Sequence, residues 1–266
     1  MQIQAKKSLG QHFLHSKKVL NDIVATANIA KDEIILEIGP GTGILTGELL
    51  KTGAKVIAVE KDIRSFELLK EKFGEYIANE KLILIYDDIL KFDCAKAGLL
   101  ENKYALVANI PYYITGAILE KFLASIPRPN RVVLLTQKEV SERIVARDKK
   151  ESILSISVKA FGIPDLISKV PRGAFVPPPT VESAILAINN ISDKKFTENK
   201  LDISRFFEIV RAGFAHKRKF VIRNLELIAD PETIKKAWIE LGFDEKIRAE
   251  DMTLEHWFAL STKIST

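Results

Sequence analysis

The residues best suited to chemistry form the tetrapeptide Asn109-Ile110-Pro111-Tyr112. Asn109 offers one acceptor and two donors, and Tyr112 offers a flat ring. Pro111 has no N–H and biases Ile110 toward extended geometry, so the Ile110 carbonyl is free to face a ligand. Two acceptors beside an aromatic face suit the exocyclic amino group of a stacked base. The competing interpretation is a strand that ends in a turn at Asn109 and is stopped by Pro111. A motif of only four residues does not exclude this interpretation.

A second candidate site is the glycine cluster Glu37–Gly43, where glycines allow a tight turn and close approach to a ligand. Glu60 follows about 20 residues later, where a carboxylate can accept both ribose hydroxyls of an adenosine-containing cofactor. The NAD fingerprint requires glycine where this chain has Ile44, which argues against NAD. Asp88 could accept from an adenine amino group, although such a residue is more often a cap. A purely structural glycine turn is the alternative.

Alternating strands and helices must position these residues. Strands are expected at 33–38, 55–59, 82–86, 104–108 and 131–136, with helices at 43–50, 63–73, 116–125 and 138–147. This alternation predicts an α/β fold, a Rossmann-like mostly parallel sheet with helices on both faces. Two further expected strands, Ser152–Phe161 and Val181–Ile188, have no helix between them, so we expect an antiparallel edge. Ligands of such sheets bind at the carboxyl ends of the strands, which places the candidate sites together.

The composition changes at the polar stretch Asn189–Lys200, which we interpret as a linker. It separates a first domain at 1–192 from a second at 193–266. The second has helical periodicity and a helix start at Asp230-Pro231, which predicts a small all-helical C-terminal domain.

Charge and cysteine content limit the class of protein. The chain has 266 residues, 47% of them hydrophobic, and a net charge of +5, which suggests a polyanionic partner. Its single cysteine, Cys94, excludes an internal disulfide and fits a reducing compartment. Without Cys/His spacing for zinc or an apolar run long enough for a bilayer, we expect no metal, no membrane and a cytoplasmic location.

Basic residues gather in two places. An N-terminal arm carries Lys6 and Lys7, and the segment 211–223 contains no acid. The basic side chains of that segment are Arg211, Lys217, Arg218, Lys219 and Arg223. Both groups fit contacts with an RNA backbone, whereas the alternative is a solvated helix face.

Taken in order, these motifs resemble those of a known family over nearly the whole chain. The matching stretches are 7–14, Glu37–Gly43, Val59-Glu60, Asp88, Asn109–Tyr112, 175–184 and the basic segment at Arg211. They resemble class I S-adenosylmethionine-dependent methyltransferases and, more closely, the ribosomal RNA adenine N6,N6-dimethyltransferases. Two branches compete, the small-subunit enzyme of ribosome biogenesis and the large-subunit enzymes that confer macrolide resistance. The segment 248–253 with Trp257 favours the first.

The resemblance implies a cofactor, a substrate and roles for individual residues. S-adenosylmethionine would contact His12, Leu14, Gly39, Gly41, Glu60, Asp88 and Asn109. The catalytic set would be Asn109, Ile110, Pro111, Tyr112 and Phe175, with the target adenine flipped between the Tyr112 and Phe175 rings. The substrate would be two adjacent adenosines in a loop near the 3′ end of small-subunit (16S) rRNA, and the partner the small ribosomal subunit. The first domain would then be catalytic, the second would bind RNA, and the protein would act as a monomer.

Two positions depart from the family pattern, and two further functions stay open. The family usually has asparagine at the positions of His12 and Tyr113, so a side-chain contact of His12 to the cofactor is in question and Tyr113 either stacks or packs. The protein could act mainly as a ribosome-assembly checkpoint. It could also be a cofactor-binding RNA adaptor without turnover, against which Asn109 and Tyr112 argue.

Overall fold

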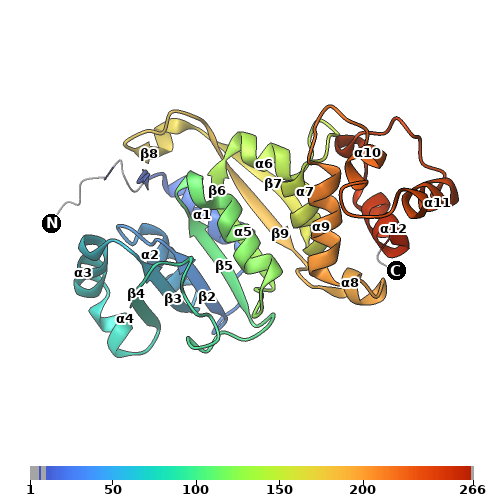
Figure 1. The fold of residues 1–266 in the computed structure, drawn as a ribbon. Helices are drawn as coiled ribbons and strands as arrows, with labels where there is room; N and C mark the ends of the chain where they lie inside the picture. Colours follow the sequence, from blue (N-terminus) through green and yellow to red (C-terminus); the bar gives the residue numbers. More distant parts are fainter. Residues whose placement is uncertain (1–5, 7–9, 265–266) are drawn as a thin grey trace. The chain divides into compact units, whose positions relative to one another are not determined.

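The structure, a computed structural model, describes residue 6 and residues 10–264 (Figure 1). The chain divides into two compact units, each built from two stretches of sequence. The first unit comprises Met1–Ser141 and Ile163–Ile191, and the second comprises Glu142–Gly162 and Ser192–Thr266. The expected boundary after residue 192 is close to the second junction, but residues 142–162, expected in the first domain, pack within the second unit.

The first unit is built on a seven-stranded sheet with the strand order β4-β3-β2-β5-β6-β9-β7. Its strands are β2 (Ile34–Ile38), β3 (Lys55–Glu60), β4 (Leu82–Tyr86), β5 (Tyr104–Asn109), β6 (Arg131–Gln137), β7 (Ile163–Val170) and β9 (Ser183–Asn189). The first five strands in this order are parallel, whereas β9 is antiparallel to both β6 and β7. The predicted mostly parallel sheet with an antiparallel edge is confirmed.

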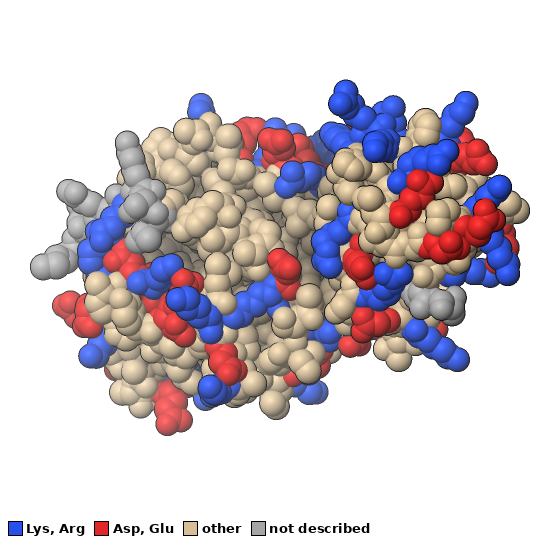
Figure 2. All heavy atoms as spheres, viewed as in Figure 1, with Lys and Arg blue, Asp and Glu red and all other residues tan. Residues whose placement is uncertain are grey.

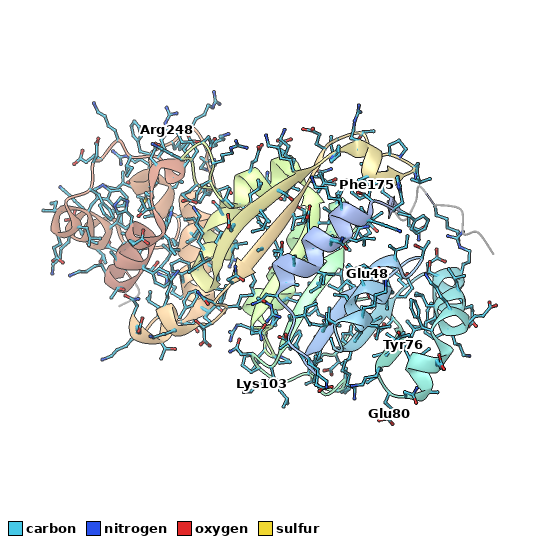
Figure 3. The ribbon with its side chains drawn as sticks, turned by 180° about the vertical axis from the view of Figure 1, so that it is seen from behind. Glu48, Tyr76, Glu80, Lys103, Phe175 and Arg248 are labelled. Atoms are coloured by element: carbon cyan, nitrogen blue, oxygen red, sulfur yellow. The ribbon has the colours of Figure 1, made fainter. Side chains whose placement is uncertain are left out.

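Helices cover both faces of this sheet. They are α1 (Lys17–Ala27), α2 (Ile44–Lys51), α3 (Ile63–Lys72), α4 (Gly74–Ala78), α5 (Thr115–Ala124) and α6 (Lys138–Ile144). Figures 1 and 3, which are opposite views, show α5 on one face and α1 on the other. The helices α1, α2 and α3 bury residues such as Ile23, Leu49 and Leu69 in one cluster with Ile35 and Val107 of the sheet. This burial of apolar side chains fixes the strands whose ends carry the candidate site.

The strand order reverses between β2 and β5. From β2 the chain first adds β3 and β4 on one side, and it then adds β5 and β6 on the other side. These two strands are parallel and in register, with Ile38 opposite Ala108. Ligands of open α/β sheets bind in the crevice outside the strand ends at such a switch point. The glycine turn follows β2 here, and Asn109 ends β5.

A second, two-stranded sheet pairs distant parts of the same unit. The strands β1 (Phe13–Leu14) and β8 (Phe175–Val176) are antiparallel, with Leu14 opposite Phe175. The pairing is extended by a hydrogen bond of 2.9 Å from the His15 N–H to the Ala174 carbonyl. It brings the segment around residue 12 against the proline-rich loop after β8.

The expected strand at Ser152–Phe161 is wrong, because this stretch is the helix α7 (Ile153–Phe161). Ser152 and Ser155 form a capping box, in which each side chain accepts from the backbone N–H of the other. Such a box satisfies two donors at a helix start and outweighs the alternating pattern. The strand that pairs with β9 is instead β7, which begins just after this helix.

The second unit is helical and its core is aromatic. Besides α7 it contains α8 (Lys194–Glu198), α9 (Ile203–Gly213), α10 (Val221–Leu225), α11 (Pro231–Leu241) and α12 (Leu254–Ile264). The ring of Phe196 lies 5.1 to 5.2 Å from those of Phe161, Phe206 and Phe258. Within residues 6 and 10–264, no helix has the length and apolar character needed to cross a membrane.

Candidate active site

A cavity of about 200 Å³ lies at the switch point of the sheet. It is lined by residues 10–14, the glycine turn after β2, the ends of β3 and β4, and the segment 109–114. Ten of the predicted site residues therefore line one cavity, namely His12, Leu14, Gly39, Gly41, Glu60, Asp88, Asn109, Ile110, Pro111 and Tyr112.

The glycine turn provides an open backbone wall. Gly39 and Gly41 have φ values of +62° and +59°, in the left-handed region that favours glycine. A Cβ atom added to Gly39 would meet no atom within 4 Å, whereas one added to Gly41 would lie 3.2 Å from the Phe13 ring. The backbone at Gly39 therefore leaves room for a ligand in direct contact.

The Glu60 carboxylate is fixed at the end of β3 by two backbone donors. Gly41 N–H donates to its Oε2 at 3.0 Å, and Asp62 N–H donates to its Oε1 at 2.7 Å. Burial raises the pKa of this carboxyl, which is 5% exposed, and the backbone donors oppose that shift. Since each carboxylate oxygen has a further lone pair, Glu60 can still accept hydrogen bonds from a ligand.

Glu37, near the end of β2, is a cavity residue to which the sequence analysis assigned no role. It is 1% exposed, and burial raises its pKa to about 8, with the nearby Glu60 adding to the shift. Its Oε2 has no hydrogen-bond partner among the described residues. Hydrogen bonds from Thr46 to the carboxyl oppose part of the pKa shift. The signal in the sequence was an acid inside a buried strand, since a carboxyl group is rarely fully buried without a partner or a function.

Asp88, at the end of β4, already has partners in this structure. Lys61 Nζ lies 2.6 Å from its Oδ2, and the Leu90 N–H donates to its Oδ1 at 3.1 Å. The hydrogen bond from Lys61 is the main reason that the pKa of Asp88 is lowered. An adenine amino group would therefore share or replace the ammonium of Lys61.

Asn109 and His12 are linked across the cavity. Asn109 Nδ2 donates to the His12 carbonyl oxygen at 3.3 Å, which leaves Asn109 Oδ1 as an acceptor for a ligand. His12 Nδ1 lies 2.8 Å from the Pro177 carbonyl oxygen, so this nitrogen carries a proton. The His12 side chain therefore contacts the proline-rich loop through one nitrogen and keeps the other for the cavity.

Tyr112 presents its ring beside Asn109. It begins the short 3-10 helix Tyr112–Ile114, and its hydroxyl is hydrogen-bonded to that of the buried Ser183. Burial raises the pKa of this phenol, so the hydroxyl stays protonated. The ring is stacked with that of His12 at a centroid distance of 6.1 Å and an angle of 19°.

Phe175 is not brought to the cavity. Figure 3 labels Phe175. Its side chain is 2% exposed and belongs to the hydrophobic cluster of the first unit, whereas its neighbour Val176 is 61% exposed. Successive side chains of a strand point to opposite faces, and the register with Leu14 turns Phe175 inward. The ring that faces Tyr112 in this structure is that of His12, which differs from the expected second wall.

The predicted RNA-binding residues lie in both units. Figure 2 shows Lys and Arg gathered over the part of the second unit that carries α10. Arg211 is in the last turn of α9, Lys217, Arg218 and Lys219 are exposed in the loop that follows, and Arg223 pairs with Glu226 on α10. In the first unit, Lys6 is exposed and its N–H donates to Gln11 Oε1, whereas Lys7 lies outside the described residues.

The described residues 6 and 10–264 contain no cluster of three or more His, Cys, Asp or Glu able to hold a metal ion.

Comparison with known proteins supplies further evidence. The family model described as ribosomal RNA adenine dimethylase matches residues 2–265. A protein of Dehalococcoides mccartyi named ribosomal RNA small subunit methyltransferase A is 41% identical over 257 residues, 96% of this chain and 87% of that protein. A protein of the same name from Thermosynechococcus vestitus is 38% identical over 267 residues, 97% and 96% of the two chains.

Two crystal structures are similar to this chain over most of their length. A dimethyladenosine transferase from Plasmodium falciparum has a TM-score of 0.76 and 26% identity, covering 94% of this chain and 96% of that one. The 23S rRNA methyltransferase ErmE has a TM-score of 0.72 and 24% identity, covering 96% and 100%. The second likeness shows a shared fold.

Proposed function

The chain belongs to the ribosomal RNA adenine dimethylase family, and on that basis we propose that it is an S-adenosylmethionine-dependent enzyme of small-subunit rRNA. Its reaction is the N6,N6-dimethylation of two adjacent adenosines in a loop near the 3′ end of 16S rRNA. The observation that carries this proposal is one cavity that joins Asn109 and Tyr112 to the glycine turn and Glu60. The relatives at 38% and 41% identity are named for the small subunit, which favours it over the large-subunit alternative.

The cavity offers the cofactor an open backbone wall and several polar groups. The open space at Gly39 admits a ligand against the backbone, and Glu37 has a buried oxygen without a partner. S-adenosylmethionine supplies an electrophilic methyl group on a cationic sulfonium. Glu37 is largely protonated at neutral pH because burial raises its pKa to about 8, so it offers a ligand a polar group and not a charge. We assign Glu60 to the ribose hydroxyls, Asp88 to the adenine, and the segment of His12 and Leu14 to the methionine end.

Asn109, Ile110 and Tyr112 prepare the target amino group. The Tyr112 ring stacks with the flipped adenine, while Asn109 Oδ1 and the Ile110 carbonyl accept from its N6 hydrogens. These hydrogen bonds pull N6 toward tetrahedral geometry and localise its lone pair for in-line attack. No strong general base is required, since the N6 proton becomes acidic once the methyl group has been transferred. The catalytic contribution is therefore positioning and polar preorganisation.

The second wall of the base slot requires a small movement. A base between two rings needs about 7 Å, twice the van der Waals contact distance of about 3.5 Å. The ring centroids of His12 and Tyr112 are 6.1 Å apart, so at least one of the two rings has to move, by about 1 Å or more, to admit a base. We assign Phe175 a positioning role, because its pairing with Leu14 holds the segment that carries His12.

The basic residues are assigned to the RNA backbone. Lys217, Arg218 and Lys219 are exposed, as is Lys6, and phosphate contacts supply sequence-independent affinity. Lys7, Arg211 and Arg223 complete this group. The partner is the small ribosomal subunit, and the protein binds it as a monomer in the cytoplasm. Binding of immature subunits is compatible with a role as an assembly checkpoint.

Transfer of a labelled methyl group to undermethylated small subunits, followed by nucleoside mass spectrometry, tests the proposal. We expect N6,N6-dimethyladenosine at two adjacent positions, and far less with the Asn109→Ala variant. Large subunits serve as the control substrate. Label in large subunits alone would favour the alternative branch, and tight subunit binding without any transfer would favour the adaptor.

A further inference from the structure

Tyr113 is the most exposed aromatic side chain of Phe, Tyr or Trp type among the described residues. It is 68% exposed, whereas the next, Tyr86, is 54% exposed. It lines the mouth of the same cavity as Tyr112. An exposed aromatic ring at the edge of a ligand site offers a flat face on which a nucleic-acid base can stack.

One side of the Tyr113 ring is close to the backbone at Gly10. Gly10 has a φ of +60°, and a Cβ atom added there would lie 3.2 Å from the Tyr113 ring and 3.6 Å from Pro111. A side chain at this position would crowd the Tyr113 ring, so the glycine lets the backbone lie close to it. Since most of the side chain is exposed, the remaining surface of the ring is open to solvent.

Tyr112 and Tyr113 turn in different directions, although they are adjacent. Both belong to the 3-10 helix Tyr112–Ile114, where successive side chains are about 120° apart. Tyr112 is half-buried and hydrogen-bonded to Ser183, whereas Tyr113 faces solvent. One ring therefore serves the interior of the cavity and the other its rim.

A cation lies beside this rim. The Lys61 side chain is 62% exposed, and its pKa is raised mainly by its hydrogen bond to Asp88, with a smaller contribution from Tyr113. Lys61 and Tyr113 also line the same cavity. An open aromatic ring with an ammonium group nearby matches the two parts of a nucleotide, a base that stacks and a phosphate that carries negative charge.

We propose that Tyr113 is the stacking platform for the nucleotide next to the target adenosine. This inference rests on the proposed function, because it assumes that an adenosine of RNA occupies the cavity. When one of two adjacent adenosines enters the slot at Tyr112, its neighbour stacks on Tyr113 near the positive charge of Lys61. The platform thus holds the strand in register and selects substrates in which an unpaired base adjoins the target.

Kinetics on undermethylated small subunits test the platform. Loss of one stacked base lowers kcat/KM for Tyr113→Leu by about 5- to 100-fold, mostly through KM for the subunit. Tyr113→Phe and Tyr113→Trp retain most of kcat/KM, because the ring is what stacks. Tyr76→Leu is the matched control, since Tyr76 is an exposed aromatic on α4 that does not line the cavity. The thermal unfolding midpoint of each variant shows that it is folded.

A photo-crosslinking amino acid at position 113 gives a second readout. With undermethylated subunits, the crosslink maps to the nucleotide next to a methylated adenosine, and the same amino acid at position 76 gives none there. A wild-type kcat/KM for Tyr113→Leu, or a crosslink elsewhere in the rRNA, overturns the platform. Failure of the proposed function is distinguishable, because then the wild-type protein itself transfers no methyl group.

Discussion

Asn109 donates one hydrogen bond to the His12 carbonyl, and this contact fixes its amide beside the Tyr112 ring. The proposed hydrogen bond from N6 to Asn109 Oδ1 is needed most as N6 becomes tetrahedral, so it acts in the transition state. Asn109→Ala is expected to lower kcat by about 100-fold or more, by analogy with loss of one preorganised group in other enzymes. RNA binding stays near normal because phosphate contacts elsewhere supply most of it. Single-turnover methylation of undermethylated subunits measures the effect.

Asn109→Asp is a useful second variant to compare with Asn109→Ala. It keeps an acceptor but adds charge beside the adenine and the sulfonium, so we expect a poor enzyme that is still active. A fully active Asn109→Ala would instead show that this residue serves only as a turn residue.

Glu37 predicts a dependence of stability on pH. Its folded-state pKa is raised from an ordinary value of 4.5 to about 8 because burial disfavours the charged form. The folded protein therefore holds this proton more tightly, and its contribution to stability is complete below about pH 4.5 and lost as the pH rises to about 8. Urea unfolding at several pH values should show this loss, on the order of a few kcal/mol, in the wild type.

Glu37→Gln is the control for that titration, since it keeps the shape and removes the ionisation. We expect its free energy of unfolding to fall less between pH 4.5 and pH 8 than that of the wild type. An identical fall in both proteins would mean that Glu37 ionises in the folded state as it does in the unfolded one.

The short strand β8 gives a prediction at the scale of the element. Phe175 is buried in the core and Val176 is exposed, although the two residues are adjacent. Phe175→Ala should lower the free energy of unfolding by about 3 to 5 kcal/mol, and Val176→Ala by less than about 0.5 kcal/mol. Denaturant unfolding of the two variants makes the comparison. A Phe175→Ala variant as stable as the wild type would contradict the core position of this ring.

The elements with strong local signals were predictable. Buried apolar runs such as Tyr104–Ala108 indicated the parallel strands. Because Glu60 and Asn109 stand at the ends of two such runs, they were expected at the carboxyl ends of strands. The strand β7 was missed because it contains Pro164 and lies at the sheet edge, where the apolar side chains of Ile163 and Ile167 are at exposed positions. The helix α7 was missed because its apolar residues fit a period of two as well as a helix.

The sequence predicted which residues line the cavity better than it predicted the contacts between them. Motif positions at strand ends must meet at one edge of a parallel sheet, which is why ten predicted residues line one cavity. The pairing of Lys61 with Asp88 and the stacking of His12 with Tyr112 depend on side-chain geometry. The inward direction of Phe175 depends on its register with Leu14, which no local pattern contains.

At the scale of the whole molecule, the cavity and the basic cluster of Lys217, Arg218 and Lys219 belong to separate units of the chain. The cavity is lined by the first unit alone, whereas the cluster Lys217, Arg218 and Lys219 belongs to the second. A division of this kind lets substrate affinity and methyl transfer be changed independently. It also explains how a net charge of +5 can coexist with a cavity whose buried side chains include Glu37 and Glu60.

Replacing Lys217, Arg218 and Lys219 together by Gln tests the role of the basic cluster. We expect weaker binding to undermethylated small subunits and a salt dependence whose slope is reduced by up to about 3, because each phosphate contact releases about one counterion. The affinity for S-adenosylmethionine, measured by calorimetry, should hardly change, since none of the three lines the cavity.

The matched control replaces Lys235, Lys236 and Lys246, which are also exposed in the second unit. Both triple variants change the net charge from +5 to +2, so a general attraction to a polyanion predicts the same loss in each. A specific footprint predicts a loss in the first variant only, because close phosphate contacts are lost there, whereas distant charges are screened beyond about 10 Å at 0.1 M salt. Equal salt slopes for the two variants would reduce the cluster to a solvated surface, and the RNA contacts would then have to be sought among the residues around the cavity mouth.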